Sequence, residues 1–141
     1  VFEQQHRLLD WGVKRVRRGE HTRALGKIEL LIKVYQPEAF LLEMSETPLR
    51  SVKQQSLAMA ITDWALVQGI TTLTVTRGAV RAHFEPFGAS TKHQIAREIV
   101  RMVPALAPKL PPARKPWQSE DARMAIFGAV SIALCWYSSW R

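Results

Sequence analysis

The spacing of apolar residues along the first twenty positions is typical of extended chain. In residues 7–17, Leu9, Trp11 and Val13 alternate with polar residues or glycine, which predicts a strand. Val1 to Glu3 also has the character of a strand interior.

After Glu20 the period changes to steps of three and four residues, which predicts a helix with one apolar face. Its apolar positions are Ala24, Leu25, Ile28, Leu31, Ile32 and Tyr35. Pro37 should end this helix, because a proline pushes the residue before it, Gln36, out of the α region.

Strands and helices then alternate. Residues 39–44 form a short apolar run with one carboxylate, Glu43, which predicts a buried strand. Thr47 as N-cap and Pro48 predict the start of a helix that runs to about residue 68, where Gly69 closes it.

The next segment, residues 70–76, is rich in β-branched residues and predicts a strand. Gly88, Ala89 and Ser90 should open a helix that Pro104 ends. This alternation predicts a single α/β domain over residues 1–141, with helices packed on a sheet that contains parallel strands. Sites in such a sheet form at the C-terminal ends of strands, near Glu43.

The last part of the chain combines a basic loop with an uncharged helix. Residues 104–118 are rich in proline and carry Lys109, Arg114 and Lys115, which predicts a stiff, extended, basic loop. Ser119 should cap the last helix. Residues 124–140 contain no charge, and a buried core helix explains them better than a membrane anchor, because serines interrupt the run and acidic residues precede it.

The charge balance favours a polyanionic partner. Twenty Lys and Arg against twelve Asp and Glu leave a net charge of +8. Such a surface favours nucleic acid or an anionic membrane, with ordinary solubility as the plain alternative. The single cysteine, Cys135, excludes an internal disulfide, and its apolar surroundings predict a buried structural thiol in a reducing cytoplasm.

Candidate chemistry centres on carboxylates. A charged group in an apolar strand, as at Glu43, must be paired, protonated, exposed at the strand end or bound to a metal. Glu120 and Asp121 are expected in the first turn of the last helix, either as caps or as partners of Glu43 in a Mg²⁺ or Mn²⁺ site. The four histidines show no metal-binding spacing, and core or rim packing is the favoured role of the five tryptophans over base stacking.

The order of several segments resembles the RuvC family of Holliday-junction resolvases, which have an RNase H-like fold: a mixed sheet flanked by helices. In this chain the segments are RLLDWGVKRVR at residues 7–17, Tyr35-Gln36-Pro37, Phe40-Leu41-Leu42-Glu43, the helix to residue 68, Ala79-Val80-Arg81, residues 88–95 and residues 124–134. The series covers almost the whole chain, although no single segment is specific.

The resemblance implies a dimeric, Mg²⁺-dependent endonuclease that acts on branched DNA. It makes Glu43 a metal-binding catalytic carboxylate and gives Asp121, which would share a helix face with position 128, the same expected role. We expect DNA contacts from the basic side chains Arg77, Arg81, Lys92, Lys109, Arg114 and Lys115.

Two departures from the family stand out. Its opening strand, with an essential aspartate, would precede Val1, so the first strand is expected to be missing from this chain. The last helix of the family also carries metal-facing aspartates, where this chain has Ala125 and Gly128. These departures leave a second hypothesis open, a non-catalytic nucleic-acid-binding module that retains the fold.

Overall fold

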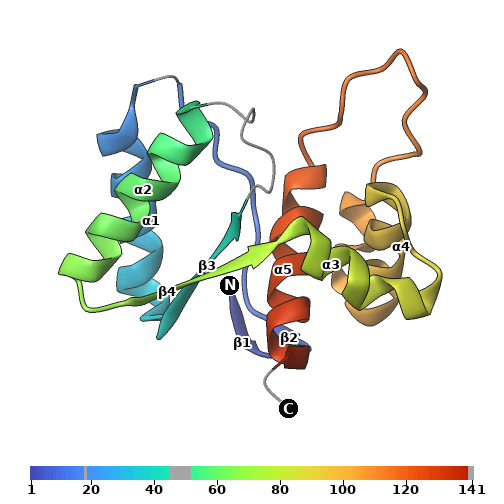
Figure 1. Cartoon of the computed structure of the whole chain (residues 1–141), viewed down its shortest axis with the longest axis horizontal. Coiled ribbons are helices and arrows are strands. Elements are labelled where there is room, and N and C mark those ends of the chain that lie inside the picture. The colour runs from blue at the N-terminus through green and yellow to red at the C-terminus, as the bar shows by residue number, and fades with distance from the viewer. Residues whose placement is uncertain (18, 45–51, 140–141) are drawn as a thin grey trace. The chain divides into compact units, whose positions relative to one another are not determined.

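The computed structural model describes residues 1–17, 19–44 and 52–139, with helices and short strands in two compact units (Figure 1). Unit 1 consists of Val1–Val13 and Val75–Arg141, and unit 2 of Lys14–Thr74. The predicted mixed α/β class is confirmed. The described strands form two separate pairs, and the finer RNase H-like arrangement stays a prediction.

Unit 2 confirms most of the elements predicted for it. Helix α1 (His21–Tyr35) contacts α2 (Val52–Val67), and strand β3 (Ala39–Met44) pairs in parallel with β4 (Thr71–Thr76). Gln36 ends α1 in the left-handed region, with φ 46°, so it leaves the right-handed α region as predicted but does not adopt the extended conformation that a following proline favours. Gly69, with φ 72°, follows the end of α2, whereas the predicted start at Thr47 and Pro48 lies outside the described residues.

Strand β3 is less buried than the sequence predicted. Its first four residues are half-buried, and Glu43 and Met44 are exposed. Each strand of a two-stranded sheet has an edge without a neighbouring strand. Pairing with β4 alone therefore covers only part of β3.

Unit 1 begins with an antiparallel hairpin of β1 (Phe2–Gln4) and β2 (Arg7–Leu8). The predicted strand over residues 7–17 is wrong beyond Leu8. The backbone N–H of Trp11 donates to the Asp10 side chain at 2.8 Å, which is local bonding that competes with a strand ladder. Leu9, Trp11 and Val13 are also exposed, so their alternation does not mark a buried face.

Three helices build the core of unit 1. Helix α5 (Met124–Ser139) contacts both α3 (Arg77–Phe84) and α4 (Lys92–Met102). The largest fully buried side chains are Phe84, Ile99, Leu106, Phe127 and Leu134. Cys135 is buried as predicted, and burial raises the pKa of its thiol.

Helix α5 is the buried core helix that the sequence favoured, with eight buried residues. Within the described ranges, no helix has both the length and the apolar character needed to cross a membrane.

The starts of α3 and α4 depend on threonine caps. Helix α3, which the sequence pattern did not predict, directly follows β4, where the Thr76 side chain accepts a hydrogen bond from the Ala79 N–H at 3.1 Å. For α4, Thr91 is the N-cap and forms a capping box with Gln94, rather than the predicted opening at residues 88–90. Gly88, with φ 72°, instead ends the short 3₁₀ helix η1 (Glu85–Phe87).

The segment between α4 and α5 differs from the predicted extended loop. Its first part is the 3₁₀ helix η2 (Pro104–Lys109), which contacts α4 because its Leu106 side chain is fully buried. Ser119 does not cap α5, which begins at Met124. Asp121 organises that start instead, since its carbonyl oxygen accepts from the Met124 N–H at 3.0 Å.

Candidate nucleic-acid interface

Positive charge is concentrated in residues 75–141, which contain ten Lys and Arg against four Asp and Glu. Residues 14–74 contain nine against six. The six basic residues predicted to contact nucleic acid all belong to unit 1. Whether each of them can contact a phosphate depends on its exposure and on whether it already forms an ion pair with a carboxylate.

Helix α3 carries Arg77 and Arg81 one turn apart, so the two residues lie on the same helix face. Val80 and Phe84 are buried in the core, and Arg81 is exposed. Arg77 is half-buried and engaged with other groups. Of the two, Arg81 is the one with its guanidinium group available to a phosphate.

Helix α4 presents three cations, two of which are paired. Lys92 Nζ lies 2.9 Å from Glu120 Oε1, and Arg101 donates to both carboxylate oxygens of Glu98 at 3.1 and 2.9 Å. Arg97 is exposed and forms no ion pair within the described ranges. An exposed pair such as Lys92–Glu120 is weak, so Lys92 can exchange its carboxylate for a phosphate.

The segment after α4 supplies Lys109, Arg114 and Lys115, all exposed as predicted. Lys115 Nζ lies over the ring of Trp117, 5.4 Å from its centroid. Trp117 itself is 78% exposed, so core or rim packing is wrong for this tryptophan. Among the others, Trp64 and Trp136 are half-buried.

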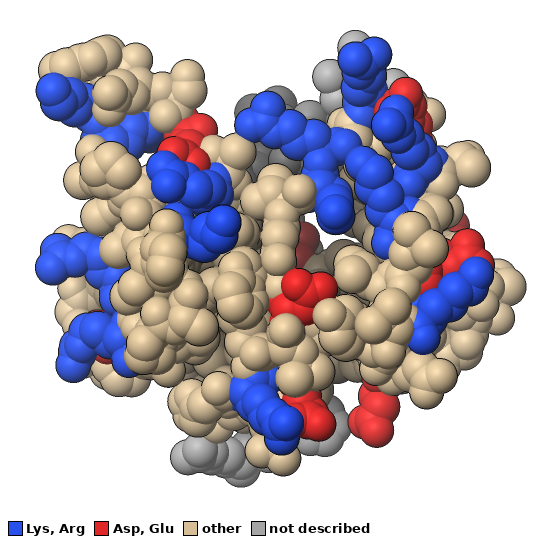
Figure 2. All heavy atoms as spheres, turned by 180° about the vertical axis from the view of Figure 1, so that it is seen from behind, with Lys and Arg blue, Asp and Glu red and all other residues tan. Residues whose placement is uncertain are grey.

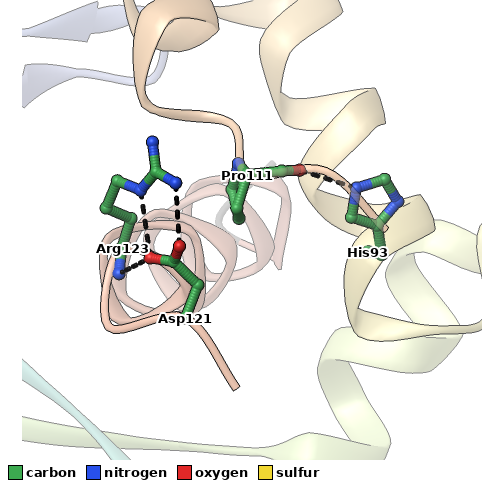
Figure 3. A network of polar contacts seen from close by, with 4 residues as sticks. All are labelled: His93, Pro111, Asp121 and Arg123. Carbon is green, nitrogen blue, oxygen red and sulfur yellow. Dashed lines mark hydrogen bonds and ion pairs between the residues drawn. The ribbon is translucent and has the colours of Figure 1, made fainter. Parts of the chain in front are cut away.

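Asp121, a predicted metal ligand, is held by Arg123 (Figure 3). Its oxygens accept hydrogen bonds from the Arg123 backbone N–H at 2.9 Å, from Nε at 3.0 Å and from Nη2 at 2.8 Å. The side-chain hydrogen bonds from Arg123 lower the pKa of Asp121 to about 2. Asp121 is therefore ionised at neutral pH, but a metal ion must displace the guanidinium group to reach it.

The structure also changes the expected relation between Asp121 and Gly128. Asp121 precedes α5 and is not part of the helix, so the prediction that it shares a helix face with Gly128 is wrong. A Cβ atom built at Gly128 meets no atom within 4 Å. Close packing therefore does not explain the glycine, and the position can accept a side chain.

Glu43 lies at the exposed end of β3 and is engaged with other groups. It belongs to unit 2, whereas Asp121 and Gly128 belong to unit 1. Over residues 1–17, 19–44 and 52–139, no three His, Cys, Asp or Glu side chains group in a way that could hold a metal ion.

Unit 2 carries a further basic surface that was not predicted from the sequence. Lys14, Arg15 and Arg17 are exposed, and Lys27 Nζ donates to the Arg15 carbonyl oxygen at 3.2 Å. Figure 2 shows Lys and Arg side chains gathered most densely at the upper right, over the part of unit 2 where α1 begins. The run of basic residues from Lys14 to Arg18 could have predicted this surface, but most of it was assigned to the strand expected at residues 7–17.

No family model matches this chain, and neither a curated protein nor a solved structure matches it.

Proposed function

We propose that this chain binds the phosphate backbone of a nucleic acid through exposed Lys and Arg side chains. The observation that carries the proposal is a set of exposed cations with no ion pair to any described carboxylate. The set contains Lys14, Arg15 and Arg17 in unit 2 and Arg81, Arg97, Lys109, Arg114 and Lys115 in unit 1.

Unpaired cations suit a polyanion for two reasons. They do not have to break an internal ion pair before they bind, and arginine can donate two parallel hydrogen bonds to one phosphate. Each phosphate that they neutralise releases counterions, which supplies most of the affinity for a nucleic-acid backbone.

The test compares two triple variants with the same change in net charge. Arg81→Gln/Lys109→Gln/Arg114→Gln removes unpaired cations, whereas Arg7→Gln/Arg23→Gln/Lys33→Gln removes cations paired with Glu3, Glu20 and Glu29. Fluorescence polarisation with a four-way junction, a duplex and a single strand at two salt concentrations gives the affinity of each.

We expect the first variant to lose affinity and salt dependence, and the second to stay close to the parent. Equal losses in both variants would show a nonspecific effect of net charge. Salt-independent binding by the parent, or no binding at low salt, would contradict the proposal.

A narrower form of the proposal is a Mg²⁺- or Mn²⁺-dependent endonuclease for branched DNA that acts as a homodimer, as the resemblance to the RuvC family implies. The observation in its favour is the open space at Gly128, where that family carries an aspartate. Since Arg123 holds Asp121 and no three described His, Cys, Asp or Glu side chains group to hold a metal ion, we assign no metal-dependent step to this chain as it stands. The homodimer is tested by sedimentation velocity.

A further inference from the structure

The segment between η2 and α5 is attached to α4 at both of its ends. Near its start, His93 Nε2 lies 3.0 Å from the carbonyl oxygen of Pro111 (Figure 3). Near its end, Glu120 accepts from Lys92 Nζ at 2.9 Å. Lys92 and His93 are neighbours in the first turn of α4, so one turn of helix contacts the segment near both of its ends, and the exposed Lys92–Glu120 pair is the weaker of the two contacts.

The part of the segment between these attachments, residues 112–119, is ordered by its own contacts, and we call it the tip. The Lys115 N–H donates to Gln118 Oε1 at 3.0 Å, and the Gln118 N–H donates to the Lys115 carbonyl oxygen at 3.0 Å. Pro112 and Pro116 fix their own φ angles. The tip therefore loses little conformational entropy when a ligand binds.

Trp117 is the aromatic side chain of this tip, and it is exposed. With 78% of its surface exposed, it departs from the usual behaviour of a residue that is highly buried on average. Lys115 lies over its ring, and Arg114 is adjacent in sequence and exposed. The tip contains these two cations and no acidic residue.

We propose that Trp117 is a stacking platform for an unpaired base, with Arg114 and Lys115 contacting the flanking phosphates. This inference rests on the proposed function and narrows its ligand to a single-stranded or locally unpaired nucleic acid. An aromatic ring stacks on any base, but only a base that is outside a duplex has an open face to offer. Lys115 covers one side of the indole, and the high exposure of Trp117 leaves the other side for the base.

The experiment uses the full chain with two oligonucleotides of equal length, one of thymidine and one abasic. Both present the same phosphates, so the difference in affinity measures the contribution of the bases. We expect the parent to bind the thymidine strand on the order of tenfold more tightly. Trp117→Ala should abolish this preference, whereas Trp117→Tyr should retain most of it.

Trp11→Ala is the matched control, because Trp11 is an exposed tryptophan of the same unit outside the tip. It should leave the preference for bases unchanged. A second readout is tryptophan fluorescence. Stacking should quench the parent on binding thymidine, and Trp117→Phe should lose most of this quenching while it still binds.

The outcomes separate this inference from the proposed function. Salt-sensitive binding of both strands with equal affinity would overturn the stacking role alone, and no binding of either strand at low salt would overturn both. Vesicles of phosphatidylserine and phosphatidylcholine test the competing membrane role. If Trp117→Ala weakens binding to these vesicles but leaves the preference for bases intact, the stacking role is wrong.

Discussion

Unit 1 fully buries several large apolar side chains, whereas the large apolar side chains described in unit 2 are half-buried or exposed. Phe84, Ile99, Leu106, Phe127 and Leu134 are all less than 3% exposed in unit 1. The buried apolar residues described in unit 2 are the alanines Ala24 and Ala65. Its exposed apolar side chains include Leu30 at 65%, Val34 at 70%, Met59 at 66%, Leu66 at 78% and Val67 at 81%.

This contrast assigns different roles to the two parts of the chain. Burial of large side chains supplies most of the stability of a fold, so unit 1 should dominate the free energy of unfolding. Both units nevertheless carry unpaired cations. The buried side chains that stabilise unit 1 and the cations that we propose to bind phosphate are therefore different sets of residues.

The largest effect that we expect is on stability, from one large truncation in each unit. Phe84→Ala in unit 1 should lower the free energy of unfolding by about 3–5 kcal/mol, because it removes a fully buried ring and leaves a cavity. Leu66→Ala in unit 2 should change it by no more than about 0.5 kcal/mol. Chemical denaturation measures both, and similar losses would contradict the contrast between the units.

The second effect concerns which unit contacts phosphate. Lys14→Gln/Arg15→Gln/Arg17→Gln in unit 2 should reduce the salt slope of DNA binding by roughly 0.7–0.9 for each phosphate contact removed. The unit 1 variant Arg81→Gln/Lys109→Gln/Arg114→Gln should reduce it similarly if both units bind. Affinity measured over a series of salt concentrations gives the salt slope of each variant. An unchanged slope in one variant would show that the unit it alters does not contact phosphate, and would restrict the interface to the other unit.

A smaller effect is expected from Gly128→Asp in unit 1. Because the position has room and Asp is a slightly better helix former than Gly, the free energy of unfolding should rise by about 0.3 kcal/mol. Thermal denaturation measures the change. A loss of about 1–3 kcal/mol would indicate overpacking and contradict the open space at this position.

The same variant also tests the endonuclease. If position 128 faces a metal site, Gly128→Asp should raise both the affinity for Mg²⁺, measured by calorimetric titration, and the rate of junction cleavage. Gly128→Asn adds a side chain of similar size without the charge and is the matched control. No gain from Asp over Asn would contradict the narrower, catalytic proposal.

The smallest effect is the pH dependence of the Asp121–Arg123 pair. Since Arg123 lowers the pKa of Asp121 to about 2, the pair stabilises the fold above the ordinary carboxyl pKa near 4, and this contribution is lost as the pH falls toward 2. Asp121→Asn should therefore flatten the acid limb of a plot of melting temperature against pH. An unchanged limb would show that this exposed pair contributes nothing measurable.

Local sequence signals predicted the interiors of elements better than their boundaries. The three- and four-residue spacing of apolar residues was sufficient to predict α1, and the β-branched run was sufficient to predict β4, because each pattern lies within a single element. The prediction of a strand at residues 7–17 was wrong beyond Leu8, because an alternation of apolar and polar residues does not by itself provide a partner strand. Helix α3 was missed, because its eight residues directly follow β4 without a glycine or proline between them.

The sequence predicted which residues give the candidate site its positive charge, but not the ion pairs that some of its residues form. Lys109, Arg114 and Lys115 were expected to be exposed basic residues, and they are. The pairing of Lys92 with Glu120, 28 residues away, depends on how the long segment folds back to α4, which no local pattern encodes. Asp121 was misplaced for a different, local reason: α5 begins only at Met124, so Asp121 lies in the preceding turn, where Arg123, two residues away, holds its carboxylate.

The capping box of α4 has one further consequence, for the electric field around this helix. The Gln94 side-chain oxygen accepts from the Ser90 N–H, the Ser90 hydroxyl and the Thr91 N–H at 3.0, 3.1 and 3.2 Å. A glutamate could accept the same bonds, but its charge would cancel the positive pole of the helix macrodipole, which is equivalent to roughly half an elementary charge. The neutral amide stabilises the start of α4 and preserves that positive pole beside Lys92, where it would add to the attraction for the nucleic acid that we propose as the ligand.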